Sequence, residues 1–168
     1  PGYPGVLALN LALGAAVLFL LWRLGERWFG PPVGLTALAL GAFYPPFLFH
    51  GAQPMRETAL AAFSLGVVAA VSRAAELGTA RAWALAALVT VAAALTNTTF
   101  LPFGLVVVPA GMLWLGRRDP RAALRAAAVY ATVFCAAYSP WPLRNHARFG
   151  RMILGSTAGA ASSFYIYL

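Results

Sequence analysis

The chain has 168 residues, of which 61% are hydrophobic and only 10% are charged, and its mean hydropathy is +0.77. A soluble domain of this size has too large a surface relative to its core to bury so much apolar area, so the composition predicts a lipid environment. Twelve basic residues, all arginine, against four acids give a formal net charge of +8. These arginines lie between apolar runs, which is typical of membrane loops and argues against a nucleic acid partner.

Apolar runs follow one another along the chain, each near the length of about 17 to 25 residues that a spanning helix needs. They cover residues 6–22, 33–49, 58–71, 82–95, 100–115 and 122–138. The sequence therefore predicts an all-α bundle of about six membrane segments in a single transmembrane domain, residues 1–168. The third and fourth runs are short, which leaves open whether they are tilted or partly re-entrant.

Prolines mark the expected breaks, because proline cannot continue a helix but can begin the next one. Pro31 and Pro32 separate the first two runs, and the Pro45-Pro46 pair is expected to end or kink the second. Pro102 and Pro109 are expected to kink the fifth run. The single cysteine, Cys135, lies inside an apolar run and excludes an internal disulfide.

The distribution of arginines predicts the orientation, because cytoplasmic loops are enriched in basic residues. Eight arginines lie in one set of loops and four in the other: Arg23, Arg27, Arg73, Arg81, Arg117, Arg118, Arg121 and Arg125 against Arg56, Arg144, Arg148 and Arg151. The larger set is assigned to the cytoplasm. The hairpin tip at residues 44–58, the turn at residues 96–99 and the stretch 141–151 then share the outer face.

The hairpin tip holds His50, Arg56 and Glu57, and Glu57 is the acid assigned to the outer side. An ionisable group at the edge of a bilayer is a candidate functional residue. Glu57 could orient a metal, a sugar hydroxyl or a catalytic partner while Arg56 holds a phosphate. The alternative is structural: a glutamate that opens a helix is stabilised by the helix dipole, and the arginine reaches lipid phosphates.

The stretch after the sixth run contains Arg144, Asn145, His146 and Arg148. Guanidinium groups bind phosphate oxygens in a bidentate way, so this composition suits a phosphate or pyrophosphate. The alternative is an interfacial anchor, with Trp141 among lipid headgroups. The polar turn at residues 96–99 either binds a ligand or only satisfies backbone groups. We find no zinc-ligand spacing, Gly-rich phosphate loop or serine elbow.

Residues 140–153 resemble the Pro-Trp-x-x-Arg-Asn-x-x-x-Phe-Gly segment of bacterial membrane glycosyltransferases of the protein-mannosyltransferase and aminoarabinose-transferase type. Tyr44-Pro45-Pro46 followed by Glu57 is similar to the proline-marked hairpin of that family. Asn10 and residues 27–30, which follow the first apolar run, are similar to residues in the second helix of that family. Residues 156–159 are similar to its Ser-Thr-Asn-Gly-Gly stretch but lack the asparagine, and residues 95–99 lack the arginine and proline of its Leu-Thr-Arg-Pro-Thr segment.

The resemblance implies part of a C-type glycosyltransferase fold in the bacterial cytoplasmic (inner) membrane. Such enzymes transfer a sugar from a polyprenyl-phosphate carrier to a lipid or protein acceptor on the outer face. The main catalytic acid of the family would lie upstream of Pro1, so the chain is expected to be an inactive fragment. Glu57 is then the second acid of the site, and the candidates for binding substrate or phosphate are His50, Arg56, Arg144, Asn145 and Arg148.

No metal ligand is assigned, and a divalent metal cofactor stays an open alternative. Two other classes share the same features. A transporter or flippase subunit would have the same helices and arginines. It would more often have charged residues or broken helices near the bilayer midplane. A purely structural membrane subunit predicts that Glu57 and Arg144 tolerate alanine.

Overall fold

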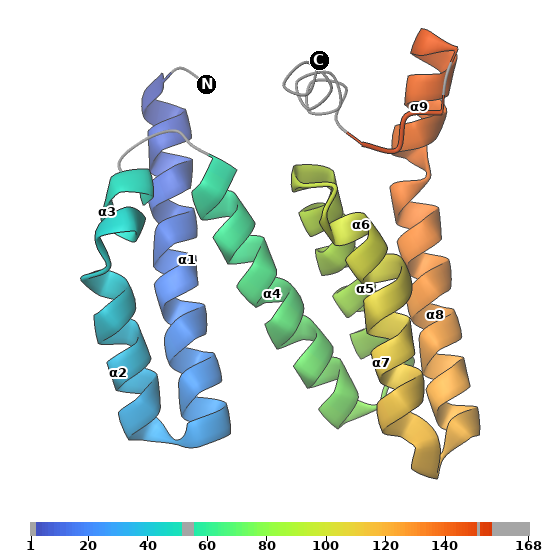
Figure 1. Cartoon of the computed structure of the whole chain (residues 1–168), viewed down its shortest axis with the longest axis horizontal. Helices are drawn as coiled ribbons and strands as arrows, with labels where there is room; N and C mark the ends of the chain where they lie inside the picture. Colours follow the sequence, from blue (N-terminus) through green and yellow to red (C-terminus); the bar gives the residue numbers. More distant parts are fainter. Residues whose placement is uncertain (1–2, 52–55, 151, 156–168) are drawn as a thin grey trace, which may run out of the picture. The chain divides into compact units, whose positions relative to one another are not determined.

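The computed structural model describes residues 3–51, 56–150 and 152–155, and the regular elements in these ranges are helical (Figure 1). The expected all-α class is therefore confirmed. Within the described ranges, three helices are long and apolar enough to cross a membrane: Pro4–Phe29, Arg56–Leu77 and Pro120–Phe149. The other apolar helices are shorter, so the structure does not confirm six spanning segments. The chain divides into two compact units, Pro1–Ala69 and Ala70–Leu168.

Unit 1 contains α1 (Tyr3–Phe29), α2 (Pro31–Ala42), α3 (Pro45–Gly51) and the first part of α4 (Arg56–Leu77). Helices α1 and α2 form a hairpin around Gly30, whose φ of 93° suits glycine. The hairpin packs tightly: a Cβ on Gly34 would lie 2.8 Å from the backbone N of Glu26 and the carbonyl oxygen of Trp22. A glycine at this position lets the two backbones meet.

The second apolar run, residues 33–49, is divided as its prolines predict. Helix α2 ends at Ala42, and α3 begins at Pro45 after a turn in which Tyr44 N–H donates to the Gly41 carbonyl. Proline has no N–H to continue the helical hydrogen bonds, so Pro45 starts a new helix. Because α2 has 12 residues, the run is not one membrane-spanning helix.

Helix α4 is longer than the third apolar run, residues 58–71. It has 22 residues, which corresponds to about 33 Å and exceeds the roughly 30 Å of a bilayer core. The helix continues past Val71 through Arg73 and Glu76, which lie three residues apart and form an exposed ion pair, with Nη1 and Oε2 3.6 Å apart. Counting apolar residues alone therefore underestimated this helix.

Unit 2 consists of the end of α4 and the helices that follow it. These are α5 (Ala80–Thr96), α6 (Phe100–Pro102), the π-helix η1 (Phe103–Val107), α7 (Val108–Leu115), the 3₁₀-helix η2 (Gly116–Arg118), α8 (Pro120–Tyr138) and α9 (Pro140–Phe149). Its core joins α5, α7 and α8 through buried side chains that include Trp83, Val91, Met112, Tyr130 and Phe134. The fourth run forms α5, which at 17 residues is at the short end for a span.

The fifth run contains a π-helical turn between its two prolines. The N–H of Val108 donates to the carbonyl of Phe103, five residues earlier, and Pro109 follows immediately. Pro109 has no N–H for the carbonyl of Leu105 and its ring crowds that turn, so the helix widens just before it. The interruption between Pro102 and Pro109 is thus a π-helical turn, and the expected kinks at the two prolines stay a prediction.

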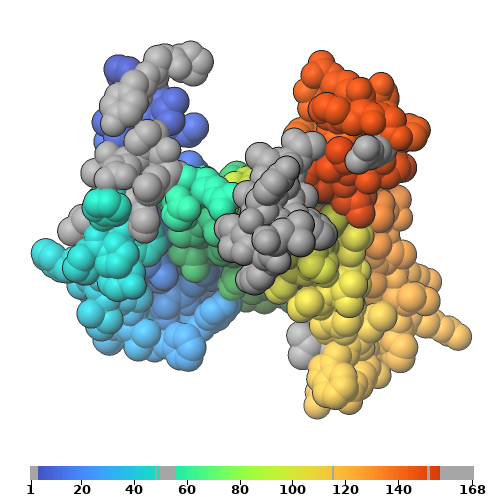
Figure 2. All heavy atoms as spheres, turned by 45° about the horizontal axis from the view of Figure 1, so that its top comes forward, coloured from blue at the N-terminus to red at the C-terminus, as the bar shows by residue number. Residues whose placement is uncertain are grey.

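The sixth run ends with α8 at Tyr138, as expected for residues 122–138, and α9 begins at Pro140. The basic stretch that follows is helical and ends at Gly150, which has a φ of 64°. In unit 2, the start of α8 and the end of α9 lie at opposite ends (Figures 1 and 2). Arg117, Arg118 and Arg121, at the start of α8, are therefore far from the arginines of α9.

Candidate functional site

Arg56 and Glu57 open helix α4. Arg56 Nε lies 3.7 Å from Glu57 Oε1, and the two side chains are 75% and 45% exposed. Exposed ion pairs of this kind contribute only about 0 to 1 kcal/mol to stability. The first turn of a helix also favours a carboxylate, because the helix dipole is positive there. Both interactions are weak, so Glu57 is free to take part in chemistry without being needed for the fold.

Glu57 also lines a small cavity in unit 1. The cavity has a volume of about 130 Å³, and its other lining residues are Tyr44, Pro46, Phe47, Thr58 and Ala61. These residues come from the turn before α3, the start of α3 and the first turns of α4, so Pro46 and the acid of the predicted hairpin line the same cavity. A carboxylate beside an apolar hollow can accept a hydrogen bond from a hydroxyl group that enters it.

The third residue of this predicted group, His50, belongs to α3, but its side chain lies outside the described part of the structure. Residues 52–55 and 156–159 also lie outside it. The role of His50 in substrate binding therefore stays a prediction, as does the likeness of residues 156–159 to the family stretch.

In unit 2, α9 presents an arginine pair to the exterior. Arg144 and Arg148 are both exposed and lie four residues apart, so they share one face of the helix. Arg144 Cζ lies 5.6 Å from the centre of the Trp141 ring, a cation–π contact. Two guanidinium groups one turn apart on an exposed face can bind a phosphate or pyrophosphate.

Asn145, another predicted binding residue, is only 2% exposed and points the other way. Its side-chain Nδ2 donates to the carbonyl oxygen of Ile153 at 3.0 Å. The hydroxyl of Tyr138 donates to the next carbonyl, that of Leu154. Asn145 therefore holds the chain that returns after α9, and the structural role of Tyr138 was not apparent from the sequence, because it depends on this chain reversal.

The returning chain touches the polar turn at residues 96–99. A Cβ on Gly155 would lie 2.8 Å from Cγ2 of Thr98. Within the turn, Asn97 Oδ1 accepts a hydrogen bond from the N–H of Thr99 at 3.0 Å. This contact favours the structural interpretation of the turn, in which its side chains satisfy backbone groups. The location of this turn and of the stretch 141–151 on one outer face of the membrane stays a prediction.

The structure brings together Arg56 with Glu57 in unit 1 and Arg144 with Arg148 in unit 2. The two pairs belong to different units, so their convergence into one pocket stays a prediction. Among the described residues, no group of three His, Cys, Asp or Glu side chains could hold a metal ion.

These observations define an all-helical protein that has helices capable of crossing a membrane and exposed arginines at helix ends. Comparisons of the chain with protein-family models, with curated proteins and with solved structures found no match.

Proposed function

We propose that the chain is part of a membrane glycosyltransferase of the C-type fold. The enzyme would transfer a sugar from a polyprenyl-phosphate carrier to a lipid or protein acceptor at the outer face of the bacterial cytoplasmic membrane. The main support is the form of the motif at residues 140–150. It folds as one helix that exposes Arg144 and Arg148 on the same face, where they can contact a phosphate, while Asn145 fixes the following chain.

In this proposal, the arginines of α9 stabilise the negative charge that develops on the lipid phosphate as the sugar leaves it. The acceptor hydroxyl must lose its proton as it attacks the sugar carbon. By the family resemblance, another carboxylate takes that proton, and Glu57 supports it by accepting a hydrogen bond from the acceptor or the sugar. Arg56 neutralises Glu57 and provides a further contact for phosphate.

The test is an assay of sugar release from polyprenyl-phosphate donors by the full-length protein in liposomes. Replacing Arg144 and Arg148 with alanine should lower kcat/KM for the donor at least tenfold for each lost phosphate contact. Arg121 and Arg125 provide the matched control, because they form an equally spaced, exposed arginine pair at the opposite end of α8. Equal losses in the two double variants would contradict a specific phosphate site on α9.

A second candidate function is a transporter or flippase subunit that moves the carrier across the membrane. The interruption of the segment Phe100–Trp114 by η1 favours it, because transporters often use broken helices in their binding sites. A liposome assay separates the two functions. A flippase moves labelled carrier between leaflets without hydrolysing the sugar linkage, whereas a transferase releases the sugar to an acceptor.

A further inference from the structure

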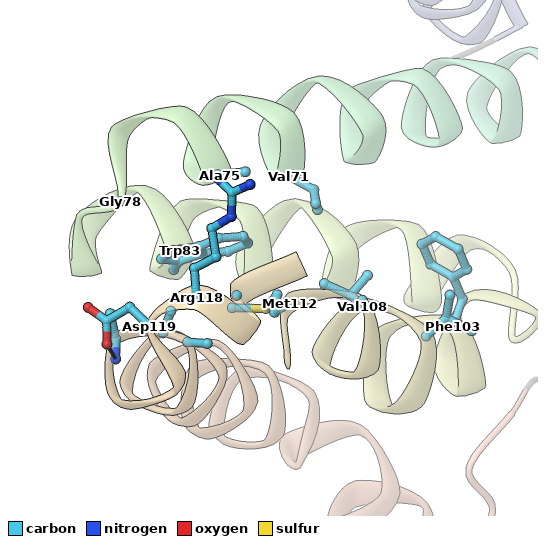
Figure 3. Close-up of a pocket in the computed structure, with 15 residues that line it drawn as sticks. Val71, Ala75, Gly78, Trp83, Phe103, Val108, Met112, Arg118 and Asp119 are labelled. Carbon is cyan, nitrogen blue, oxygen red and sulfur yellow. Dashed lines mark hydrogen bonds between the residues drawn. The ribbon is translucent and has the colours of Figure 1, made fainter. Parts of the chain in front are cut away.

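A second cavity lies wholly within unit 2, at the end opposite to α9. It has a volume of about 540 Å³, within the range of about 300 to 1,000 Å³ that is common for ligand pockets. Its walls come from the end of α4, the start of α5, the η1–α7 segment and the start of α8 (Figure 3). Most lining side chains are apolar, including Val71, Trp83, Phe103, Val108 and Met112, so the cavity suits a hydrocarbon chain better than water.

The two charged residues that line this cavity have different roles. Asp119 Oδ1 accepts a hydrogen bond from the N–H of Ala122 at 3.1 Å and so caps α8. Arg118 instead extends across the cavity towards Ala75 of α4, while Asp119 points away (Figure 3). In the described ranges, Arg118 has no ion-pair partner. Its guanidinium group is thus available to an anion that enters with an apolar chain.

Gly111 leaves part of the cavity open. It lines the cavity, and a Cβ at this position would meet no atom within 4 Å. A glycine inside a helix costs about 1 kcal/mol relative to alanine, and the packing around Gly111 does not require it. A larger side chain at residue 111 would therefore project into empty space and fill the cavity without displacing the backbone.

We propose that this cavity binds one acidic phospholipid, with an acyl chain among the apolar side chains and the phosphate on Arg118. The surrounding helix ends are basic, with Arg73, Arg81 and Arg121 in the same unit and at the end assigned to the cytoplasm. The cytoplasmic leaflet is rich in anionic lipids, and basic pockets between helices on that side bind their headgroups. The site is separate from the proposed sugar-transfer site.

The test is native mass spectrometry of the full-length protein after equilibration with equal amounts of phosphatidylglycerol and phosphatidylethanolamine. The wild-type protein should retain one molecule of phosphatidylglycerol in preference to phosphatidylethanolamine. Arg118→Gln should lower that preference about tenfold, because a charge-assisted hydrogen bond to phosphate is lost. Arg117→Gln is the matched control: it removes the same charge one residue away, where Arg117 Cζ lies 3.2 Å from the centre of the Trp114 ring.

Gly111→Phe should abolish retention by filling the cavity. The proposal is wrong if Arg117→Gln and Arg118→Gln weaken retention equally, if both lipids are retained alike, or if Gly111→Phe still retains phosphatidylglycerol. Displacement by undecaprenyl phosphate at equal concentration would also overturn it, because the occupant would then be a carrier lipid. If Gly111→Phe does not accumulate in the membrane, the comparison of the two arginine variants decides the question.

Discussion

The side-chain amide of Asn145 donates a hydrogen bond to the carbonyl oxygen of Ile153 at 3.0 Å, across the chain reversal at Gly150. Tyr138 makes a parallel contact with the neighbouring carbonyl, that of Leu154. Side chains from two successive helices thus hold the same returning segment. The asparagine of the motif therefore sets the position of the chain after α9, and the exposed arginines on either side of it remain available to a ligand.

Replacing Asn145 with alanine should loosen the returning segment. The half-buried carbonyl of Ile153 would lose its donor, which costs about 1 to 3 kcal/mol. Local opening should become about 5- to 150-fold more frequent, and trypsin should cleave after Arg148 faster by the same factor. His146→Ala is the control, because that side chain is exposed on the same helix. An unchanged cleavage rate in Asn145→Ala would show that the hydrogen bond does not hold the segment.

Glu57→Gln should lower sugar transfer by roughly 100-fold if the carboxylate takes part in proton transfer or substrate orientation. Folding should hardly change, because the ion pair with Arg56 is exposed. Helix α4 offers a matched control in Glu76→Gln: Glu76 pairs with Arg73 at 3.6 Å, and its side chain is 49% exposed against 45% for Glu57. Transfer rates should be compared at equal amounts of membrane protein. Wild-type transfer by Glu57→Gln would remove Glu57 from the mechanism.

Gly104→Ala should destabilise unit 2 by about 1 to 3 kcal/mol through overpacking. A Cβ on Gly104 would lie 2.5 Å from Cε2 of Phe134. The ring cannot easily move aside, because it is fully buried and stacked between Tyr130 and Tyr138 at centroid distances of 6.1 and 5.9 Å. The measurement is reversible unfolding in detergent micelles.

Gly111→Ala is the control for this prediction, because a Cβ there meets no atom within 4 Å. It should be neutral or stabilise the protein by up to about 1 kcal/mol, since alanine favours a helix over glycine. If both alanine variants unfold at the same midpoint as the wild-type protein, the close packing of η1 against α8 is not important for stability.

Local features of the fold could be predicted from the sequence, and contacts across the chain could not. The breaks at Pro31 and Pro45 were predicted, because a proline lacks the N–H that would continue the preceding helix. The role of Asn145 was missed, because its partner lies eight residues away beyond a chain reversal. The length of α4 was underestimated, because Arg73 and Glu76 end an apolar run without ending a helix. Hydropathy identifies the part of a helix that lipid can surround, whereas a helix can continue through charged residues beyond that part.

The orientation inferred from the arginines can be tested by cysteine labelling of the full-length protein. The native Cys135 is exposed, so it is first replaced by alanine. Single cysteines then replace Glu57 and Glu76 at the two ends of α4, and His146 in α9 and Arg117 in η2 at the two ends of unit 2. All four positions are exposed, so differences in labelling report on the side of the membrane.

In intact spheroplasts, a maleimide that cannot cross the membrane should label positions 57 and 146. Positions 76 and 117 should react only after permeabilisation, because the loops richer in arginine are expected in the cytoplasm. Labelling of positions 57 and 76 from the same side would mean that α4 does not cross the membrane. Labelling of 57 and 146 from opposite sides would prevent Glu57 and the arginines of α9 from sharing a pocket, and the proposed transferase site would then not exist.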